Sequence, residues 1–181
     1  MSSILRSSIF YPQKPCDIIE FMNERFTPQE LYDFIDRAGK ATYAGGGKYE
    51  EHPERPGFFE LVYDKELPWY YRDSYAGHSR SGGQEVVRLN DELIWWSGYG
   101  GGMVEGREDM SNQTFDFLKK ALSQDDEGFK SLRGPHEFAD GDWKYAYTQD
   151  GDITDFYGYE EISYKGEKVF WHRAVGGILK K

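Results

Sequence analysis

The sequence contains a single cysteine, Cys16, among its 181 residues. One cysteine cannot form a disulfide within the chain, and it excludes a metal site built from several cysteine thiolates. Chains without internal disulfides are typical of reducing compartments, so we expect a cytoplasmic protein.

Long apolar runs are also missing. No stretch reaches the roughly 20 apolar residues of a membrane-spanning helix, and the N-terminal residues lack the apolar segment of a secretory signal. The sequence therefore predicts a soluble protein without a membrane partner.

Positive charge is scarce, with 22 Lys and Arg against 32 Asp and Glu and a formal net charge of −10. Binding of DNA or RNA depends on neutralising phosphates with Lys and Arg. We therefore do not expect nucleic acid as a direct partner.

Familiar catalytic and metal-binding signatures are absent. The glycines of the segment 40–47 lack the spacing and the following Lys-Ser/Thr of a phosphate-binding loop, and there is no Gly-x-Ser-x-Gly motif. None of the four histidines has the i, i+4 spacing of a zinc-binding helix. The sequence predicts no metal and no cofactor, although catalytic residues distant in sequence can still meet in space.

Aromatic residues are abundant, at 17% of the chain, while hydrophobic residues overall make up only 38%. Each Phe, Tyr or Trp buries a large area. We therefore expect a core built more from rings than from aliphatic side chains, with some tyrosine hydroxyls facing a polar pocket.

Alternating apolar residues separated by turn residues predict a series of strands. We expect the stretch 67–102 to lie at the centre of the fold. Glycines 100–102 and 176–177 are expected to end strands. The predicted strands are 57–64, 68–75, 84–89, 92–99, a strand through Trp143, Tyr145 and Tyr147, 154–164 and 167–175, with hairpin turns at Asn90-Asp91, Asp150-Gly151 and Lys165-Gly166.

Two amphipathic helices are predicted. Thr27-Pro28-Gln29-Glu30 is a capping box, and Gly39 is placed to end the helix that follows it. Ser111 is expected to cap the second helix. The predicted buried stripes are Leu31, Phe34, Ile35 and Ala38 in the first helix and Phe115, Leu118 and Leu122 in the second. Between them, the glycine-rich segment 40–47 is either a flexible connector or a lid over a site.

These elements predict an α+β fold: a curved antiparallel sheet of about seven or eight strands, with two main helices packed on one face. No internal repeat stands out in the sequence. Residues 1–26 form a poorly defined extension, with an edge strand at 9–11 and a short helix at 17–22. Residues 27–181 form a single domain.

Carboxylates fall on strand faces that are otherwise aromatic. Asp73 shares a face with Trp69, Tyr71 and Tyr75, and of the neighbours Glu160 and Glu161 one must face the core. A buried carboxylate needs a partner, for which Arg72, Arg88 or tyrosine hydroxyls are candidates. Such a carboxylate either holds the sheet together or anchors a ligand in an aromatic pocket.

Several short motifs, taken together in their order and spacing, carry a family resemblance. They are Lys40-Ala41-Thr42-Tyr43-Ala44-Gly45-Gly46; Tyr71 with Asp73, Tyr75 and Gly77; Gly83-Gln84-Glu85-Val86-Val87; Trp96 with Tyr99 and Gly100; Arg133-Gly134-Pro135; Phe156 with Gly158-Tyr159-Glu160-Glu161-Ile162; and Gly176-Gly177. The chain resembles the uncharacterised family DUF5680 over roughly residues 31–179.

The resemblance implies no activity, because the family has none assigned. Its members often follow the helix-turn-helix of a transcriptional regulator, which implies a sensor or effector module. About 30 residues precede the first motif here, too few for a helix-turn-helix domain. We therefore do not expect a direct regulatory role, while small-ligand binding stays open.

Three functions are compatible with these observations. The first is a binding module whose pocket suits a planar or cationic small molecule and is lined by Tyr43, Asp73, Tyr75, Glu85, Trp96 and Tyr99. The second is a hydrolase or isomerase with Glu85 or Asp73 as general base and His78 nearby. The third is an interaction module that forms a homodimer through its edge strands.

Overall fold

The structure is a computed structural model, and it describes residues 25–126 and 128–179. The edge strand expected at 9–11, the short helix expected at 17–22 and Cys16 lie outside the described residues. The predicted extension at 1–26 is therefore almost wholly outside them.

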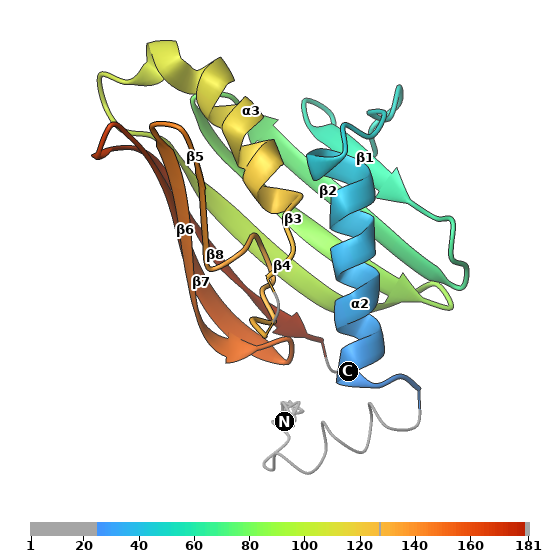
Figure 1. Cartoon of the computed structure of the whole chain (residues 1–181). Helices are drawn as coiled ribbons and strands as arrows, with labels where there is room; N and C mark the ends of the chain where they lie inside the picture. The colour runs from blue at the N-terminus through green and yellow to red at the C-terminus, as the bar shows by residue number, and fades with distance from the viewer. Residues whose placement is uncertain (1–24, 127, 180–181) are drawn as a thin grey trace, which may run out of the picture.

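Within the described residues, one antiparallel sheet of eight strands, open at both edges, is accompanied by two α-helices (Figure 1). This confirms the expected antiparallel α+β architecture. The strands are β1 (Phe59–Tyr63), β2 (Trp69–Gly77), β3 (Arg80–Leu89), β4 (Glu92–Met103), β5 (Glu137–Asp140), β6 (Trp143–Asp152), β7 (Asp155–Tyr164) and β8 (Glu167–Ile178), in the spatial order β1-β2-β3-β4-β8-β7-β6-β5.

Helix α2 (Pro28–Gly39) begins at the predicted capping box. The Glu30 amide donates to the Thr27 hydroxyl at 3.1 Å, and the Thr27 amide donates to the Glu30 carboxylate at 2.7 Å. The predicted apolar stripe is buried. Gly39 does not stop the helical path, because its φ of −61° is right-handed and the chain continues into a π-helical turn, Lys40–Ala44.

Helix α3 (Ser111–Leu122) follows a short 3₁₀ turn, Glu108–Met110. Ser111 is its first residue rather than its cap, since the hydroxyl donates back to the Glu108 carbonyl at 2.6 Å. The predicted stripe is also displaced. The buried residues are Ser111, Thr114, Phe117, Leu118 and Ala121, while Phe115 and Leu122 are partly buried.

The ends of several strands differ from expectation. Strand β4 continues through the glycines 100–102, which pair with residues 171–173 of β8, and β8 continues through Gly176 and Gly177, which pair with Ser97 and Trp96 of β4. The hairpin between β6 and β7 turns at residues 153–154 rather than at Asp150-Gly151, which pair with Tyr157 and Phe156. Strand β5 was not predicted.

A helix followed by four antiparallel strands occurs twice in the chain, first as α2 with β1–β4 and then as α3 with β5–β8. Strands β4 and β8 join the two units. Tyr99 pairs with Ala174 at the midpoint, and the pairs Ser97–Gly176 and Gly101–His172 lie symmetrically on either side. This structural repeat does not stand out in the sequence.

Ring contacts recur in the two units at matching places. Phe34 of α2 contacts Trp69 at a centroid distance of 5.2 Å, and Phe117 of α3 contacts Trp143 at 5.5 Å. The second pair of contacts, Phe34 to Tyr63 at 5.9 Å and Phe117 to Phe138 at 5.6 Å, follows the same scheme. Because the units share residues at only a few such positions, the repeat is hidden in the sequence.

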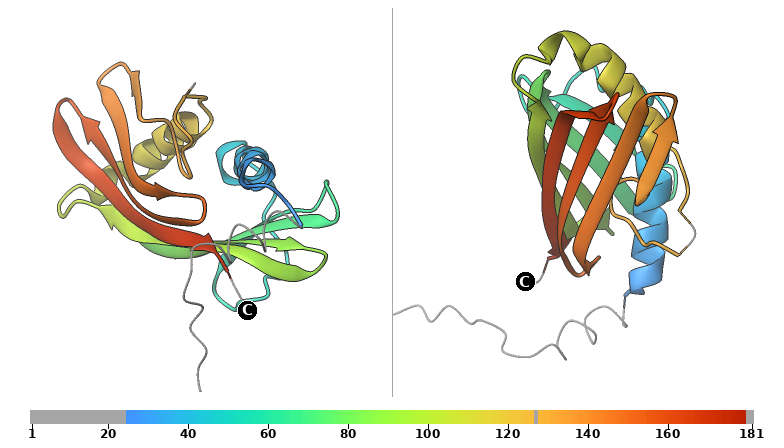
Figure 2. Two further views of the ribbon diagram at one scale, coloured as in Figure 1. Left: turned by 90° about the horizontal axis from the view of Figure 1, so that it is seen from below. Right: turned by 60° about the vertical axis from the view of Figure 1, so that its left-hand side comes forward.

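Each unit has its own hydrophobic cluster between helix and sheet. The first contains Phe34, Tyr71 and Trp95, and the second contains Phe117, Tyr145 and Phe170. Figure 2 (left) shows both helices within the hollow of the curved sheet. Among the described helices, none has the length and apolar character needed to cross a membrane.

Candidate functional site

A cavity of about 610 Å³ opens between the two helices and the sheet, at the meeting of the two units. Its volume lies within the range of small-molecule sites. The lining includes polar and tyrosine side chains from the π-helical turn, from four strands and from the loop after α3. They are Tyr43, Tyr71, Asp73, Tyr75, Glu85, Tyr99, Arg133 and His172.

Five of the six residues predicted to line a pocket lie around this cavity: Tyr43, Asp73, Tyr75, Glu85 and Tyr99. Asp73, Tyr75 and Glu85 share a face because positions two apart on a strand point the same way and cross-strand neighbours stay together. The Asp73–Glu85 and Tyr75–Gly83 pairs of the β2/β3 register place them side by side.

Trp96, the sixth predicted residue, does not line the cavity. Its indole N–H donates to Gln84 Oε1 at 3.2 Å, and its ring covers Gly98. Its neighbour Trp95 is fully buried in the core. Since adjacent strand residues point to opposite faces, Trp96 must lie on the far face of the sheet, and including it was wrong.

Asp73 lies at the floor of the cavity with 4% of its surface exposed. The Tyr99 hydroxyl, which reaches across from β4, donates to Asp73 Oδ1 at 2.6 Å. Gly83 on the intervening strand makes this possible, because a Cβ there would lie 2.6 Å from the Tyr99 hydroxyl oxygen.

Glu85 is the cross-strand neighbour of Asp73. Its Oε1 accepts a hydrogen bond from the Tyr71 hydroxyl at 3.1 Å and lies 3.5 Å from Arg133 Nη1. Its other oxygen, Oε2, is buried and has no hydrogen-bond partner among the described residues. A buried acceptor without a donor costs about 1–3 kcal/mol.

Glu160 occupies the matching position in the second unit. The Tyr145 hydroxyl donates to its Oε2 at 2.8 Å, as Tyr71 does to Glu85, and Arg133 Nη2 lies 2.9 Å from its Oε1. His172 Nδ1 lies 3.2 Å from the same Oε1, while His172 Nε2 lies 3.2 Å from the Ser81 hydroxyl. Glu161, on the opposite face, pairs instead with Lys168 at 2.7 Å.

Arg133 therefore sits between two related glutamates, one from each unit, with its side chain 8% exposed. Its guanidinium also lies 4.7 Å from the centre of the Tyr99 ring. The absence of a side chain at the next residue, Gly134, leaves room for Tyr145, because a Cβ there would lie 2.7 Å from the Tyr145 hydroxyl oxygen. Arg133 thus links the two halves of the sheet.

Sequence reasoning placed Arg133 in a turn and missed its role as the partner of the buried carboxylates. The arginines named for that role lie elsewhere: Arg72 pairs with Glu60 at 3.3 Å, and Arg88 lies over the Tyr70 ring at 5.4 Å. The available signal was the Arg133-Gly134-Pro135 motif of the family resemblance.

The three buried carboxyl groups Asp73, Glu85 and Glu160 differ in the direction in which their pKa values are shifted. Burial, together with the negative charge of Glu85, raises the pKa of Asp73 from 3.8 to about 7. Burial also raises the pKa of Glu85. Burial opposes ionisation of Glu160 as well, but the charge of Arg133 and the contact with His172 outweigh it and lower the pKa of Glu160 to about 2.

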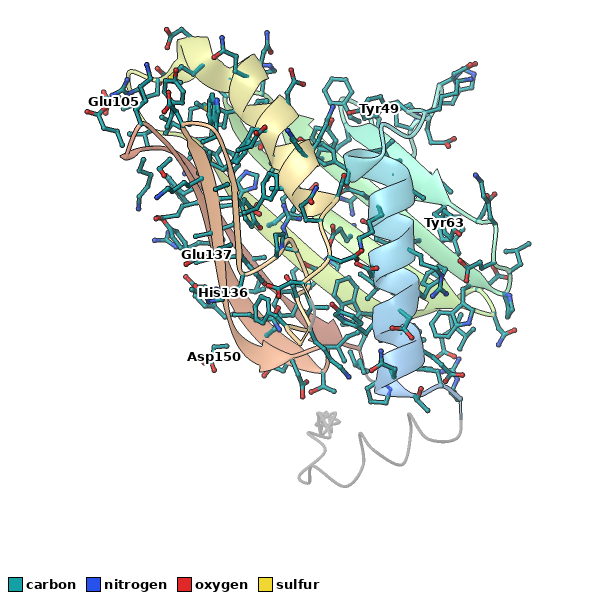
Figure 3. All side chains as sticks on the ribbon, in the orientation of Figure 1. Tyr49, Tyr63, Glu105, His136, Glu137 and Asp150 are labelled. Atoms are coloured by element: carbon teal, nitrogen blue, oxygen red, sulfur yellow. The ribbon has the colours of Figure 1, made fainter. Side chains whose placement is uncertain are left out.

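Aromatic rings form the outer part of the cavity. The π-helical turn presents Tyr43, whose ring meets that of Tyr75 edge-on at 6.0 Å. Tyr49, which lies beside β1 (Figure 3), shares a 2.6 Å hydrogen bond between its hydroxyl and that of Tyr75. Phe59 contacts Tyr75 at 5.5 Å. These four residues are called the aromatic rim below.

The predicted general-base arrangement is only partly assembled. His78 lines the cavity together with Asp73 and Glu85, but its ring packs edge-on against Phe115 at 5.4 Å. Across residues 25–126 and 128–179, no group of three His, Cys, Asp or Glu side chains has the geometry of a metal site.

A family model described as a domain of unknown function (DUF5680) matches residues 73–179. The chain belongs to the DUF5680 family. The matched region starts at Asp73 and contains Glu85, Tyr99, Arg133 and Glu160.

Part of the site lies outside the region matched to DUF5680. Tyr43 and the rest of the motif at 40–46, together with Tyr71, precede it. No curated protein and no solved structure matches the chain. The function must therefore be argued from the site itself.

Proposed function

We propose that this DUF5680 protein is a sensor-type module that binds a small organic molecule between its sheet and the two helices, which pack on one face and wall the cavity. The observation that carries the proposal is the cavity of about 610 Å³ with a buried ionisable network as its floor. Apolar pockets with a few converging polar groups and perturbed pKa values are characteristic of binding sites.

A purely structural role explains Glu160 better than it explains Asp73. Glu160 has a guanidinium, a phenol hydroxyl and an imidazole within hydrogen-bonding distance. Asp73 has the neutral Tyr99 hydroxyl, and Glu85 keeps one oxygen without a donor. Two incompletely paired carboxyls facing a cavity lower the stability of the fold. Such a cost is expected where the polar groups are kept to bind a ligand.

A thermal-shift screen of several hundred metabolites tests the proposal, because a ligand that binds only the folded state raises the melting temperature. We expect hits with the wild-type protein that are weakened by Asp73→Asn and unchanged by Trp96→Phe. Trp96 is the matched control because it lies in the same sheet but on the far face. The absence of any hit, or hits that respond equally to both substitutions, contradicts the proposal.

The second candidate is a general acid–base enzyme, a hydrolase or isomerase. The specific observation in its favour is the pKa of Asp73 of about 7, which suits proton transfer at neutral pH. Incubating each hit with the protein and following it by proton NMR distinguishes the candidates. Conversion that Asp73→Asn abolishes while binding persists supports the enzyme, and hits recovered unchanged exclude catalysis on them.

A further inference from the structure

Two carboxyl groups accompany a single guanidinium at the floor of the cavity. Asp73 and Glu85 line the floor, and Arg133 is shared between Glu85 and the buried Glu160 at 3.5 Å and 2.9 Å. Nearly all of the Arg133 side chain is buried, at 8% exposed, and its Nε has no hydrogen-bond partner among the described residues. The guanidinium is thus committed to the glutamates rather than turned toward Asp73.

The carboxyl groups on β2 and β3, Asp73 and Glu85, have less positive charge beside them than Glu160 has. Asp73 and Glu85 are direct cross-strand neighbours. A phenol hydroxyl donates to each of them, and phenols carry no compensating charge. Two adjacent buried carboxyls favour a cation between them or beside them, because it relieves both their repulsion and their desolvation.

The aromatic rim lies directly above the side of the floor formed by β2 and β3. Tyr75 is two residues beyond Asp73 on the same face of β2, and the rings of Tyr43, Tyr49 and Phe59 surround it. The faces of aromatic rings carry negative potential and attract cations. Rings above carboxylates therefore match a positively charged group joined to an apolar body.

Two lysines also line the cavity, and both are already engaged. Lys40 binds Asp36 at 3.0 Å and also pairs with Asp125, while Lys119 lies 5.4 Å from the centre of the Tyr43 ring. The balance of charge therefore favours a cation.

We propose that the ligand is an organic cation, an amine or guanidine carried on an apolar or aromatic body. Its charged group binds at Asp73 and Glu85, and its body contacts the aromatic rim. This inference rests on the proposed binding function, and it names the chemical class that this cavity selects.

Two matched series of probes test the charge requirement: 2-phenylethylamine with 2-phenylethanol and 3-phenylpropanoate, and tryptamine with indole-3-ethanol and indole-3-propanoate. Dissociation constants are measured by ligand-observed NMR or calorimetry at neutral pH. Charge-assisted hydrogen bonds predict that each amine binds about tenfold or more tightly than its alcohol, with the carboxylate weakest. An alcohol or carboxylate that binds as tightly as its amine overturns the inference, as does the failure of all six probes.

The metabolite screen separates this inference from the function on which it rests. Hits confined to neutral or anionic compounds leave binding intact and overturn the cation class. A screen without hits removes the binding function itself. Hits enriched in amines and guanidines support both.

Substitutions locate the charge. Asp73→Asn preserves shape, so we expect it to weaken amine binding about tenfold and to leave alcohol binding unchanged. Glu85→Gln provides a second test if that variant does not fold. Glu161→Gln is the control, because Glu161 lies on the other face in a pair with Lys168. Equal weakening of amine and alcohol by Asp73→Asn overturns the assignment, because it indicates a role in shape alone.

Discussion

Arg133 is the residue on which the buried network depends. Replacing it with glutamine keeps polarity but removes the charge that Glu85 and Glu160 share. Breaking a buried ion pair by removing one partner costs about 3–5 kcal/mol, since the remaining charge stays buried. We therefore expect Arg133→Gln to lower the free energy of unfolding by about that amount, as measured by urea denaturation.

Arg173→Gln is the matched control for this prediction. Arg173 is exposed on β8 and lies over the Trp171 ring at 5.0 Å. An exposed substitution of this kind changes stability by about 0.5 kcal/mol or less. Equal losses in the two variants contradict a special role for Arg133.

Asp73 makes stability depend on pH in a direction that can be stated in advance. Its pKa in the folded protein is about 7, against an ordinary value of 3.8. Between these values the folded state holds a proton that the unfolded state has released. Stability from this group is therefore present at low pH and falls as the pH rises toward 7.

Urea denaturation near pH 5 and near pH 7.5 measures this effect. We expect the difference in stability between Asp73→Asn and wild type to shift in favour of the variant at the higher pH, because asparagine does not ionise. Glu160, with a pKa lowered to about 2, acts in the opposite direction and only at acid pH. A difference that is independent of pH contradicts a raised pKa for Asp73.

Strand alternation in the sequence predicts the orientation of some residues of the site but not of others. Alternation along a strand predicts that Asp73 and Tyr75 share a face, and it predicts that one of Glu160 and Glu161 is buried. It cannot say which of Trp95 and Trp96 faces the core, because both are apolar. Arg133 was missed because a loop residue has no periodicity that shows where it points.

At the scale of elements, the capping box and apolar stripe predicted α2 well because both signals are local. The glycine-rich segments were misjudged. Glycines 100–102 were expected to end a strand, but pairing between β4 and β8 supplies hydrogen bonds that carry the strand through them. Such pairing joins distant segments, so local propensity cannot reveal it.

Gly39 gives an element-scale prediction. It is helical, with φ of −61°, and a Cβ there would meet no atom outside its own helix within 4 Å. Because glycine costs about 0.5–1 kcal/mol relative to alanine inside a helix, we expect Gly39→Ala to raise the free energy of unfolding by a similar amount.

Gly46 is the control, since it has equally open surroundings but a φ of +69°. Alanine in that left-handed conformation costs about 1–2 kcal/mol, so Gly46→Ala should destabilise the protein. A loss of stability in Gly39→Ala, measured by chemical denaturation, would show that Gly39 ends the helix as the sequence first suggested.

The whole molecule is organised by its repeat. Short turns predict an antiparallel sheet, and the strand patterns predict seven or eight strands. The part of the chain that the structure describes confirms both, with one antiparallel sheet of eight strands. The order in which the two units join could not be predicted, because it depends on the long-range pairing of β4 with β8. A homodimer through the edge strands, β1 and β5, stays a prediction.

That joining also explains where the site lies. Tyr71 with Glu85 in one unit matches Tyr145 with Glu160 in the other, and Arg133 bridges them. The second unit differs at the position of Asp73, where Tyr147 stands opposite Glu160. Asp73 therefore gives the first unit the additional carboxyl that we assign to ligand binding.

A ¹H–¹⁵N NMR titration of the wild-type protein with the tightest compound from the screen tests this account most directly. We predict that the largest shifts fall on the amides of Asp73, Glu85, Tyr99 and Arg133, around the cavity. Shifts centred on Trp96 and Trp171 at the opposite face, or no shifts at saturating compound, would contradict it.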